Sequence, residues 1–302
     1  MNLIWSSIQP SNLISTQDKC EFEENMEKFD ELKEMLKKDD KIDDLKEELQ
    51  ELASFKLSST TGIKMNIYTT PDLTVLLNLK RGDFLYRAVS FPKGMPINRQ
   101  SLFSIRSDED TNYSGRLHCA HHPVLYLSTD YETAIEEANI SDSEVLYVAK
   151  YSVKTPMTLK SVFVNVNPYT HEFLKNSDRF TTNTNGYPDW YIVTVKEMIR
   201  RTFMIPDLKD NPLEYKLTLA IANAFFPLRE VVTVEPPKET NYSGWLYNSV
   251  IQENNGSEKC NIALTSSGVK NLDLEKVNQI KNGKSINCFL PATDGSLFPK
   301  NN

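Results

Sequence analysis

Three polar side chains stand inside or beside apolar segments of this sequence. Arg87 interrupts Phe-Leu-Tyr-Arg-Ala-Val, Glu137 closes Ala-Ile-Glu-Glu, and Ser249 interrupts Trp-Leu-Tyr-Asn-Ser-Val. A guanidinium presents a planar fork of donors that matches phosphate oxygens in pairs, and a fixed carboxylate stabilises a developing positive charge. Ser249 has no neighbouring His or Lys motif that would make it a nucleophile, so we expect it to orient a ligand. Together the three residues predict a pocket.

Three further residues extend this set. Arg116 follows Gly115 and offers a second fork for phosphate, and Tyr86 and Tyr126 offer flat faces for stacking on an aromatic ring. Each residue also has a plain structural interpretation: an ion pair for an arginine, a core position for a strand tyrosine, a solvent-exposed helix position for Glu137, and a backbone-bonded strand position for Ser249.

Short β-like runs alternating with helical patterns must position these side chains, so the sequence predicts an α+β fold. The expected strands are 83–89, 124–128, 145–153, 159–164, 190–195, 246–250 and 261–264. The expected helices are 130–140, 213–226 and 272–280, the first of them with a capping box, Thr129-Asp130-Tyr131-Glu132. The tail 291–302 carries Pro, Gly, Asp and Asn and is expected to be flexible.

An acidic helical extension, residues 1–60, precedes the main domain, 61–290. Residues 20–53 carry one apolar stripe on a charged surface, and residues 21–51 hold 14 acidic and 6 basic side chains in a chain of net charge −7. The stripe must be buried against the main domain, against a second copy in a homo-oligomer, or against another protein.

Composition excludes several classes of function. No basic stripe predicts binding to nucleic acid, and no apolar run is long enough to cross a membrane. The N-terminus lacks the pattern of a secretory signal, and four scattered cysteines favour the cytoplasm. The cluster His118-Cys119-Ala120-His121-His122 has soft ligands, but adjacent ligands in one short loop rarely converge on one metal ion, so we expect no metal site.

The order of these motifs resembles the signature of the RES domain, named for its Arg, Glu and Ser. The similarity covers about residues 83–265 and runs through Leu85-Tyr86-Arg87-Ala88, Gly115-Arg116, Tyr126, Glu136-Glu137 and Leu246-Tyr247-Asn248-Ser249-Val250. The family pattern places its glutamate eleven residues after the tyrosine, which selects Glu137 over Glu136. Two positions depart from that pattern: Leu117-His118 stands where the family usually has Trp-Asn, and Asn248 replaces the usual Pro.

The resemblance implies an ADP-ribosyltransferase-like split mixed β-sheet core with flanking helices. It also implies a bacterial toxin that consumes NAD as a substrate, needs no cofactor, and has a helix-turn-helix antitoxin as partner. Carried over residue by residue, Arg87, Glu137 and Ser249 are catalytic, and Arg116, Tyr126 and Tyr86 bind NAD. The acceptor of the ADP-ribosyl group stays open between water, phosphate and a target protein. A module of another class, without catalysis and acting through its N-terminal helices, is the remaining alternative.

Overall fold

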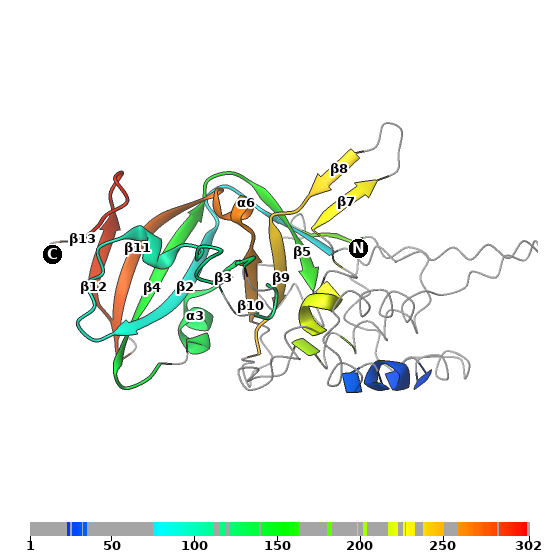
Figure 1. The fold of residues 1–302 in the computed structure, drawn as a ribbon. Helices are drawn as coiled ribbons and strands as arrows, with labels where there is room; N and C mark the ends of the chain where they lie inside the picture. The colour runs from blue at the N-terminus through cyan, green and yellow to red at the C-terminus, as the bar shows by residue number, and fades with distance from the viewer. Residues whose placement is uncertain are drawn as a thin grey trace, which may run out of the picture.

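The computed structural model describes residues 23–24, 26–31, 33–34, 75–111, 115–118, 121–138, 140–162, 180–182, 198, 202–203, 217–222, 226, 228–232, 238–250, 259–282 and 284–300. In this part the chain has the expected α+β class, with a large, mostly antiparallel sheet and few helices (Figure 1). Among the helices described, none has the length and hydropathy needed to cross a membrane.

The large sheet has eleven strands in the order β13-β12-β11-β4-β2-β3-β10-β9-β5-β1-β6. Its strands are β1 (Val75–Leu79), β2 (Phe84–Pro92), β3 (Leu125–Ser128), β4 (Glu144–Val153), β5 (Met157–Val162), β6 (Phe180–Thr182), β9 (Gly244–Asn248), β10 (Cys260–Leu264), β11 (Leu272–Lys281), β12 (Lys284–Pro291) and β13 (Leu297–Pro299). Strands β5 and β9 pair in parallel, so the sheet is mixed. Strands β7 (Arg229–Val232) and β8 (Lys238–Asn241) form a separate two-stranded sheet.

The large sheet is joined across its middle by a short contact. Strands β2 and β3 share one residue pair, Tyr86 with Ser128, whereas β2 pairs with β4 along nine residues and β3 with β10 along four. Five strands therefore lie on the β2 side of this seam and six on the β3 side. At this seam the two parts of the large sheet are joined by a single residue pair.

Side-chain alternation divides the sheet into two faces. On one face Leu85 and Tyr151 pack with Phe103, from the short helix η3 (Gln100–Phe103), in the main core. On the other face Tyr86 and Ala88 pack with Ile135 of helix α3 (Tyr131–Glu137) in a smaller cluster. We call these the η3 face and the α3 face.

Most predicted strands are confirmed to within a few residues, and the predicted helix 130–140 is α3. The predicted helix 272–280 is wrong, because these residues form β11. Apolar Leu272, Leu274, Val277 and Ile280 follow at steps of two, three and three, which resembles a helical period. The pairing with β4 shifts register between Leu274 and Lys276, so a bulge breaks the alternation expected of a strand.

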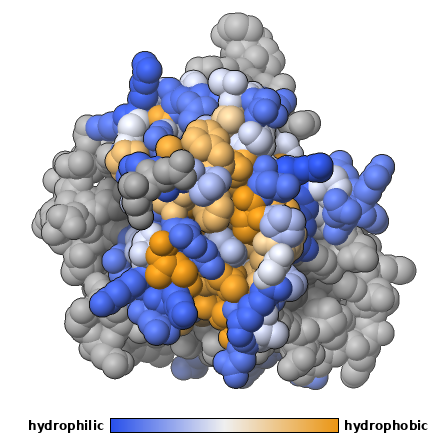
Figure 2. All heavy atoms as spheres, turned by 90° about the vertical axis from the view of Figure 1, so that its left-hand side faces the viewer, coloured by the Kyte–Doolittle hydropathy of each residue, from blue (hydrophilic) through white to orange (hydrophobic). Residues whose placement is uncertain are grey.

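Within the tail that is predicted to be flexible, residues 297–299 form β13 against the end of β12, and the flexibility itself stays a prediction. The turn between them contains Gly295 at φ +82°, a conformation that favours glycine. Figure 2 faces this end of the sheet and shows hydrophobic residues surrounded by hydrophilic ones. Ile286 and Phe298 are among the exposed large apolar residues of these two strands.

Of the N-terminal extension, residues 23–24, 26–31 and 33–34 are described, and these are helical as predicted. Met26 and Phe29 of its apolar stripe are 5% and 0% exposed within the single chain. This favours packing of the stripe on the chain itself in this stretch. The rest of the predicted extension lies outside the described residues, as does the predicted strand 190–195, and residues 217–222 of the predicted helix 213–226 are helical.

Candidate functional site

Helix α3 brings Glu137 to the seam of the sheet. The helix begins after Asp130, whose carboxylate accepts hydrogen bonds from the Thr133 backbone N–H and hydroxyl, both at 2.7 Å. The N-cap is thus Asp130, one residue later than the predicted capping box. Ile135 and Ala138 pack the helix against the α3 face. Glu137 is the last residue of this helix, and its side chain reaches Asn261 on β10 and Ser249 after β9.

The Glu137 carboxylate is exposed, yet two buried side chains hold it. Ser249 follows β9 and donates its hydroxyl proton to Oε1 of Glu137, and the Asn261 amide on β10 donates to the same oxygen at 2.8 Å. Ser249 and Asn261 are 1% and 5% exposed. Hydrogen bonds to an ionised carboxylate are stronger than neutral ones, so these two donors fix the position of Glu137. The Ser249 hydroxyl therefore serves to orient Glu137 in this structure.

The two adjacent glutamates have different surroundings. Glu136 forms an ion pair with Lys259, whose side chain is 5% exposed against 46% for that of Glu136. The carbonyl of Lys259 accepts the Ser249 backbone N–H at 2.8 Å. Lys259 thus links the end of α3 to the segment that carries Ser249. Glu136 completes this link, and Glu137 alone of the two contacts Ser249 and Asn261.

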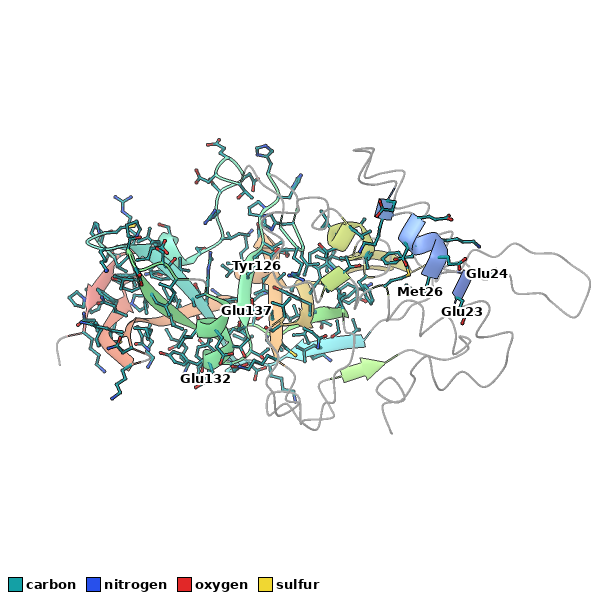
Figure 3. All side chains as sticks on the ribbon, turned by 90° about the horizontal axis from the view of Figure 1, so that it is seen from below. Glu23, Glu24, Met26, Tyr126, Glu132 and Glu137 are labelled. Carbon is teal, nitrogen blue, oxygen red and sulfur yellow. The ribbon has the colours of Figure 1, made fainter. Side chains whose placement is uncertain are left out.

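Tyr126 lies on the same face and is held by the turn before it. Its hydroxyl accepts the Leu117 backbone N–H at 2.9 Å and lies 3.0 Å from Nδ1 of His118. The Tyr126 ring also meets Tyr247 edge to face, at 6.4 Å between centroids. In Figure 3, Glu137 is nearer to Tyr126 than Glu132 is, because α3 runs toward the seam. The Leu117-His118 pair therefore has a structural role in fixing Tyr126.

Gly115 allows this turn to close on Tyr126. A Cβ at Gly115 would lie 2.2 Å from Cε1 of His118 and 3.1 Å from the Tyr126 hydroxyl. We expect Gly115→Ala to displace the His118 ring and to lower the free energy of unfolding by about 1 to 3 kcal/mol. Thermal unfolding measures the loss, and the Gly115→Ala/His118→Ala double variant should be about as stable as His118→Ala alone. A double variant that shows the full sum of both losses would contradict this geometry.

Arg116 is tied to the helical segments that follow β6 in the chain. Its guanidinium donates to the carbonyl of Phe203, and its own carbonyl accepts the Thr218 hydroxyl at 2.7 Å. Phe203 and Thr218 are fully buried. No hydrogen bond or ion pair among the described residues joins Arg116 to Glu137.

Arg87 and Tyr86 are neighbours on β2 and so project from opposite faces. Tyr86 lies on the α3 face, edge to face with Tyr131, and burial raises its pKa, helped by the nearby carboxylates of Glu132 and Asp130. The Arg87 guanidinium lies on the η3 face and donates to the carbonyls of Phe103 and Ser104, at 3.1 and 2.6 Å. The structure does not bring Arg87 to Glu137.

Tyr151 and Arg87 share a hydrogen-bond acceptor, because the Tyr151 hydroxyl also donates to the Phe103 carbonyl. Burial raises the pKa of Tyr151 far above its ordinary value, against a smaller opposing effect of the Arg87 charge, so the phenol stays a neutral donor. Arg87 and Tyr151 together fasten η3 to the sheet, which is a structural role.

A substitution distinguishes this role from catalysis. We expect Arg87→Gln to lower the free energy of unfolding by about 1.5 to 3 kcal/mol, because charged hydrogen bonds to two carbonyls are lost. Chemical denaturation measures this loss, with Arg106→Gln as a control at an exposed arginine. A variant as stable as the wild type that has lost any measured activity would instead assign Arg87 to the chemistry.

Asn261, Ser128 and Lys259 join the site although sequence reasoning did not select them. Asn261 heads the apolar run Ile262-Ala263-Leu264, so it carries the same signal, a polar residue at an apolar strand, that drew attention to Ser249. Its Oδ1 accepts the hydroxyl of Ser128, at 2.7 Å. Ser128 is also the residue that pairs with Tyr86 across the seam. The candidate site is thus a hydrogen-bonded chain from the seam to the Glu137 carboxylate.

The cluster of histidines between residues 118 and 122 is described in part. His118 contacts Tyr126 as above, and Nδ1 of His121 lies 3.0 Å from the Asp108 carbonyl. Within the described residues, no group of three or more His, Cys, Asp or Glu side chains is arranged to hold a metal ion. Comparison of the chain with protein-family models, with curated proteins and with solved structures finds no match.

Proposed function

We propose that this chain is an enzyme that cleaves the bond between nicotinamide and ribose in NAD, with water or phosphate as the acceptor. We further propose that it is a RES-domain protein with an ADP-ribosyltransferase-like fold. The observation that carries the proposal is the Glu137 carboxylate, which is exposed at the seam of the sheet and held there by the buried side chains of Ser249 and Asn261. A carboxylate fixed in this way is suited to stabilise positive charge that develops in a reaction.

The chemistry explains why a fixed carboxylate would matter. Departure of nicotinamide leaves positive charge on the ribose, as in the oxocarbenium-like transition state of glycoside cleavage. Negative charge that is already in place stabilises this state without reorganisation at the moment of reaction. Glu137 would supply that charge, and Ser249 would hold the carboxylate in place.

Two aspects of the fold support the same proposal. The seam between β2 and β3, with five strands on one side and six on the other, agrees with the split sheet expected of an ADP-ribosyltransferase-like core. Tyr126, Tyr247 and Tyr86 lie on the α3 face with Glu137, where tyrosine rings suit stacking on nicotinamide. The N-terminal residues Glu23, Glu24 and Met26 lie on the right of Figure 3, well away from Glu137 and Tyr126, so these three residues do not contribute to the site.

Product analysis tests the function and its acceptor. The purified chain is incubated with NAD, with and without phosphate, and the nicotinamide released is separated by chromatography. Free ADP-ribose in the absence of phosphate supports water as the acceptor, and a phosphorylated product formed only with phosphate supports phosphate. Labelled ADP-ribose attached to protein favours a protein acceptor. If NAD remains intact under all conditions, the proposal fails.

A further inference from the structure

Asn261 occupies a fixed place between the seam and Glu137. It lies in β10, where its backbone pairs with Ser128 of β3 on one side and Tyr247 of β9 on the other. Its side chain is 5% exposed, and that of Ser128 is 4% exposed. Strands on both sides therefore hold the Asn261 backbone, and the surrounding sheet holds the side chain.

The Asn261 amide can take only one orientation with these neighbours. Its Oδ1 accepts the Ser128 hydroxyl at 2.7 Å, and its Nδ2 donates to Oε1 of Glu137 at 2.8 Å. Turning the amide over would place its oxygen against the carboxylate oxygen, and two acceptors in contact repel. The Glu137 carboxylate thus selects the donor-toward-carboxylate orientation, and the Ser128 hydroxyl holds the oxygen end of the amide by its hydrogen bond.

Both donors to Glu137 reach the same oxygen. Ser249 and Asn261 each bond to Oε1, and Oε2 accepts no hydrogen bond within the described residues. Glu137 is exposed at the end of its helix, so an unrestrained side chain would visit several rotamers. With Oε1 held from two strands, the carboxylate presents Oε2 outward in a single direction.

We propose that Asn261 is a positioning residue, which holds the Glu137 carboxylate so that Oε2 faces the substrate, and that the hydrogen bond from Ser128 keeps the Asn261 amide in place. The inference rests on the function proposed above. Asn261 and Ser128 would then contribute to the turnover rate and not to the affinity for NAD, because neither side chain needs to touch the substrate.

Asn261→Asp is a sharp test, because aspartate has the shape of asparagine and still accepts from Ser128, but it replaces the donor to Glu137 by a second acidic group whose charge repels the Glu137 carboxylate. We expect kcat for nicotinamide release to fall about 10- to 100-fold with KM for NAD within about twofold of wild type. In a Glu137→Ala background the same substitution should change the residual rate by less than about twofold. An effect of similar size in both backgrounds, or none in the wild type, overturns the assignment.

Two controls separate positioning from general damage to the sheet. Asn78→Asp makes the same change at another strand asparagine, whose Oδ1 accepts the Thr158 hydroxyl at 2.8 Å, and should leave kcat unchanged. Ser128→Ala should lower kcat by less than Asn261→Asp, and Ser128→Thr, which restores a hydroxyl, should recover most of the rate. A loss in Asn78→Asp as large as that in Asn261→Asp counts against positioning.

A second readout does not depend on NAD. If wild-type chain releases no nicotinamide, the proposed function fails, and denaturation of the single and double variants still decides whether Asn261 holds Glu137. We then expect the shifts in denaturation midpoint of Asn261→Asp and Glu137→Ala to be clearly non-additive. Additive shifts overturn the inference in that case too.

Discussion

Replacing Glu137 by Gln is expected to slow nicotinamide release about a thousandfold and to leave NAD binding within about threefold of wild type. Glutamine keeps the shape of the side chain and an oxygen that accepts from Ser249 and Asn261, so the fold of the site is retained. The negative charge that would face the ribose is lost. A thousandfold decrease corresponds to about 4 kcal/mol of transition-state free energy.

Glu136→Gln is the matched control for this experiment, because the same change is made one residue away. Its side chain pairs with Lys259 and does not contact Ser249 or Asn261, so we expect turnover to fall far less than in Glu137→Gln, by an amount that reports the link through Lys259. Initial rates of nicotinamide release and equilibrium binding of NAD give the two numbers needed. Equal rates in the two variants would remove Glu137 from the chemistry, and loss of binding in Glu137→Gln would give it a binding role instead.

The α+β class and most strands follow from local signals. Strands such as β4 and β10 are predicted from apolar runs of four to ten residues whose composition is typical of strands. These runs are apolar because the two strands are buried in the sheet. The prediction of a helix at residues 272–280 fails because these residues form strand β11. One bulge near Glu275 changes the spacing of the apolar residues from two to three, which resembles a helix. Sequence alone gives no sign of a bulge, which arises from pairing with a partner strand.

The candidate site is predictable in its residue types more than in its contacts. Glu137 and Ser249 are 112 residues apart and meet because β9 pairs with β10 and β10 with β3, a topology that no local pattern reveals. Asn261 is not predicted as a site residue for the same reason, because its contact with Glu137 depends on which strands flank β10.

The alternation of side chains along a strand explains why Arg87 lies away from Glu137. Consecutive residues in a strand point to opposite faces, so Tyr86 and Arg87 cannot both face Glu137 from one regular strand. Grouping them by motif order placed both in one pocket. The structure puts the Arg87 guanidinium on the carbonyls of Phe103 and Ser104, and alternation along β2 already separates these two positions.

The second large effect is expected at Gly244, the first residue of β9. A Cβ there would lie 2.1 Å from the Ala263 carbonyl oxygen and 2.9 Å from Cα of Leu264, both backbone atoms of β10. Backbone in a paired strand cannot move aside as a side chain can. We therefore expect Gly244→Ala to force β9 away from β10 and to lower the free energy of unfolding by about 4 kcal/mol or more.

Gly94→Ala separates this clash from the ordinary cost of replacing a glycine. Gly94 has φ +86°, and a Cβ there would meet no atom within 4 Å, so only backbone strain of about 1 to 2 kcal/mol is expected. Urea denaturation of both variants gives the comparison. Because β9 leads to Ser249 and β10 carries Asn261, any folded Gly244→Ala protein should also lose the alignment of Glu137 and with it nicotinamide release. Equal destabilisation in the two variants would mean that β9 and β10 are not packed as closely as the Gly244 geometry requires.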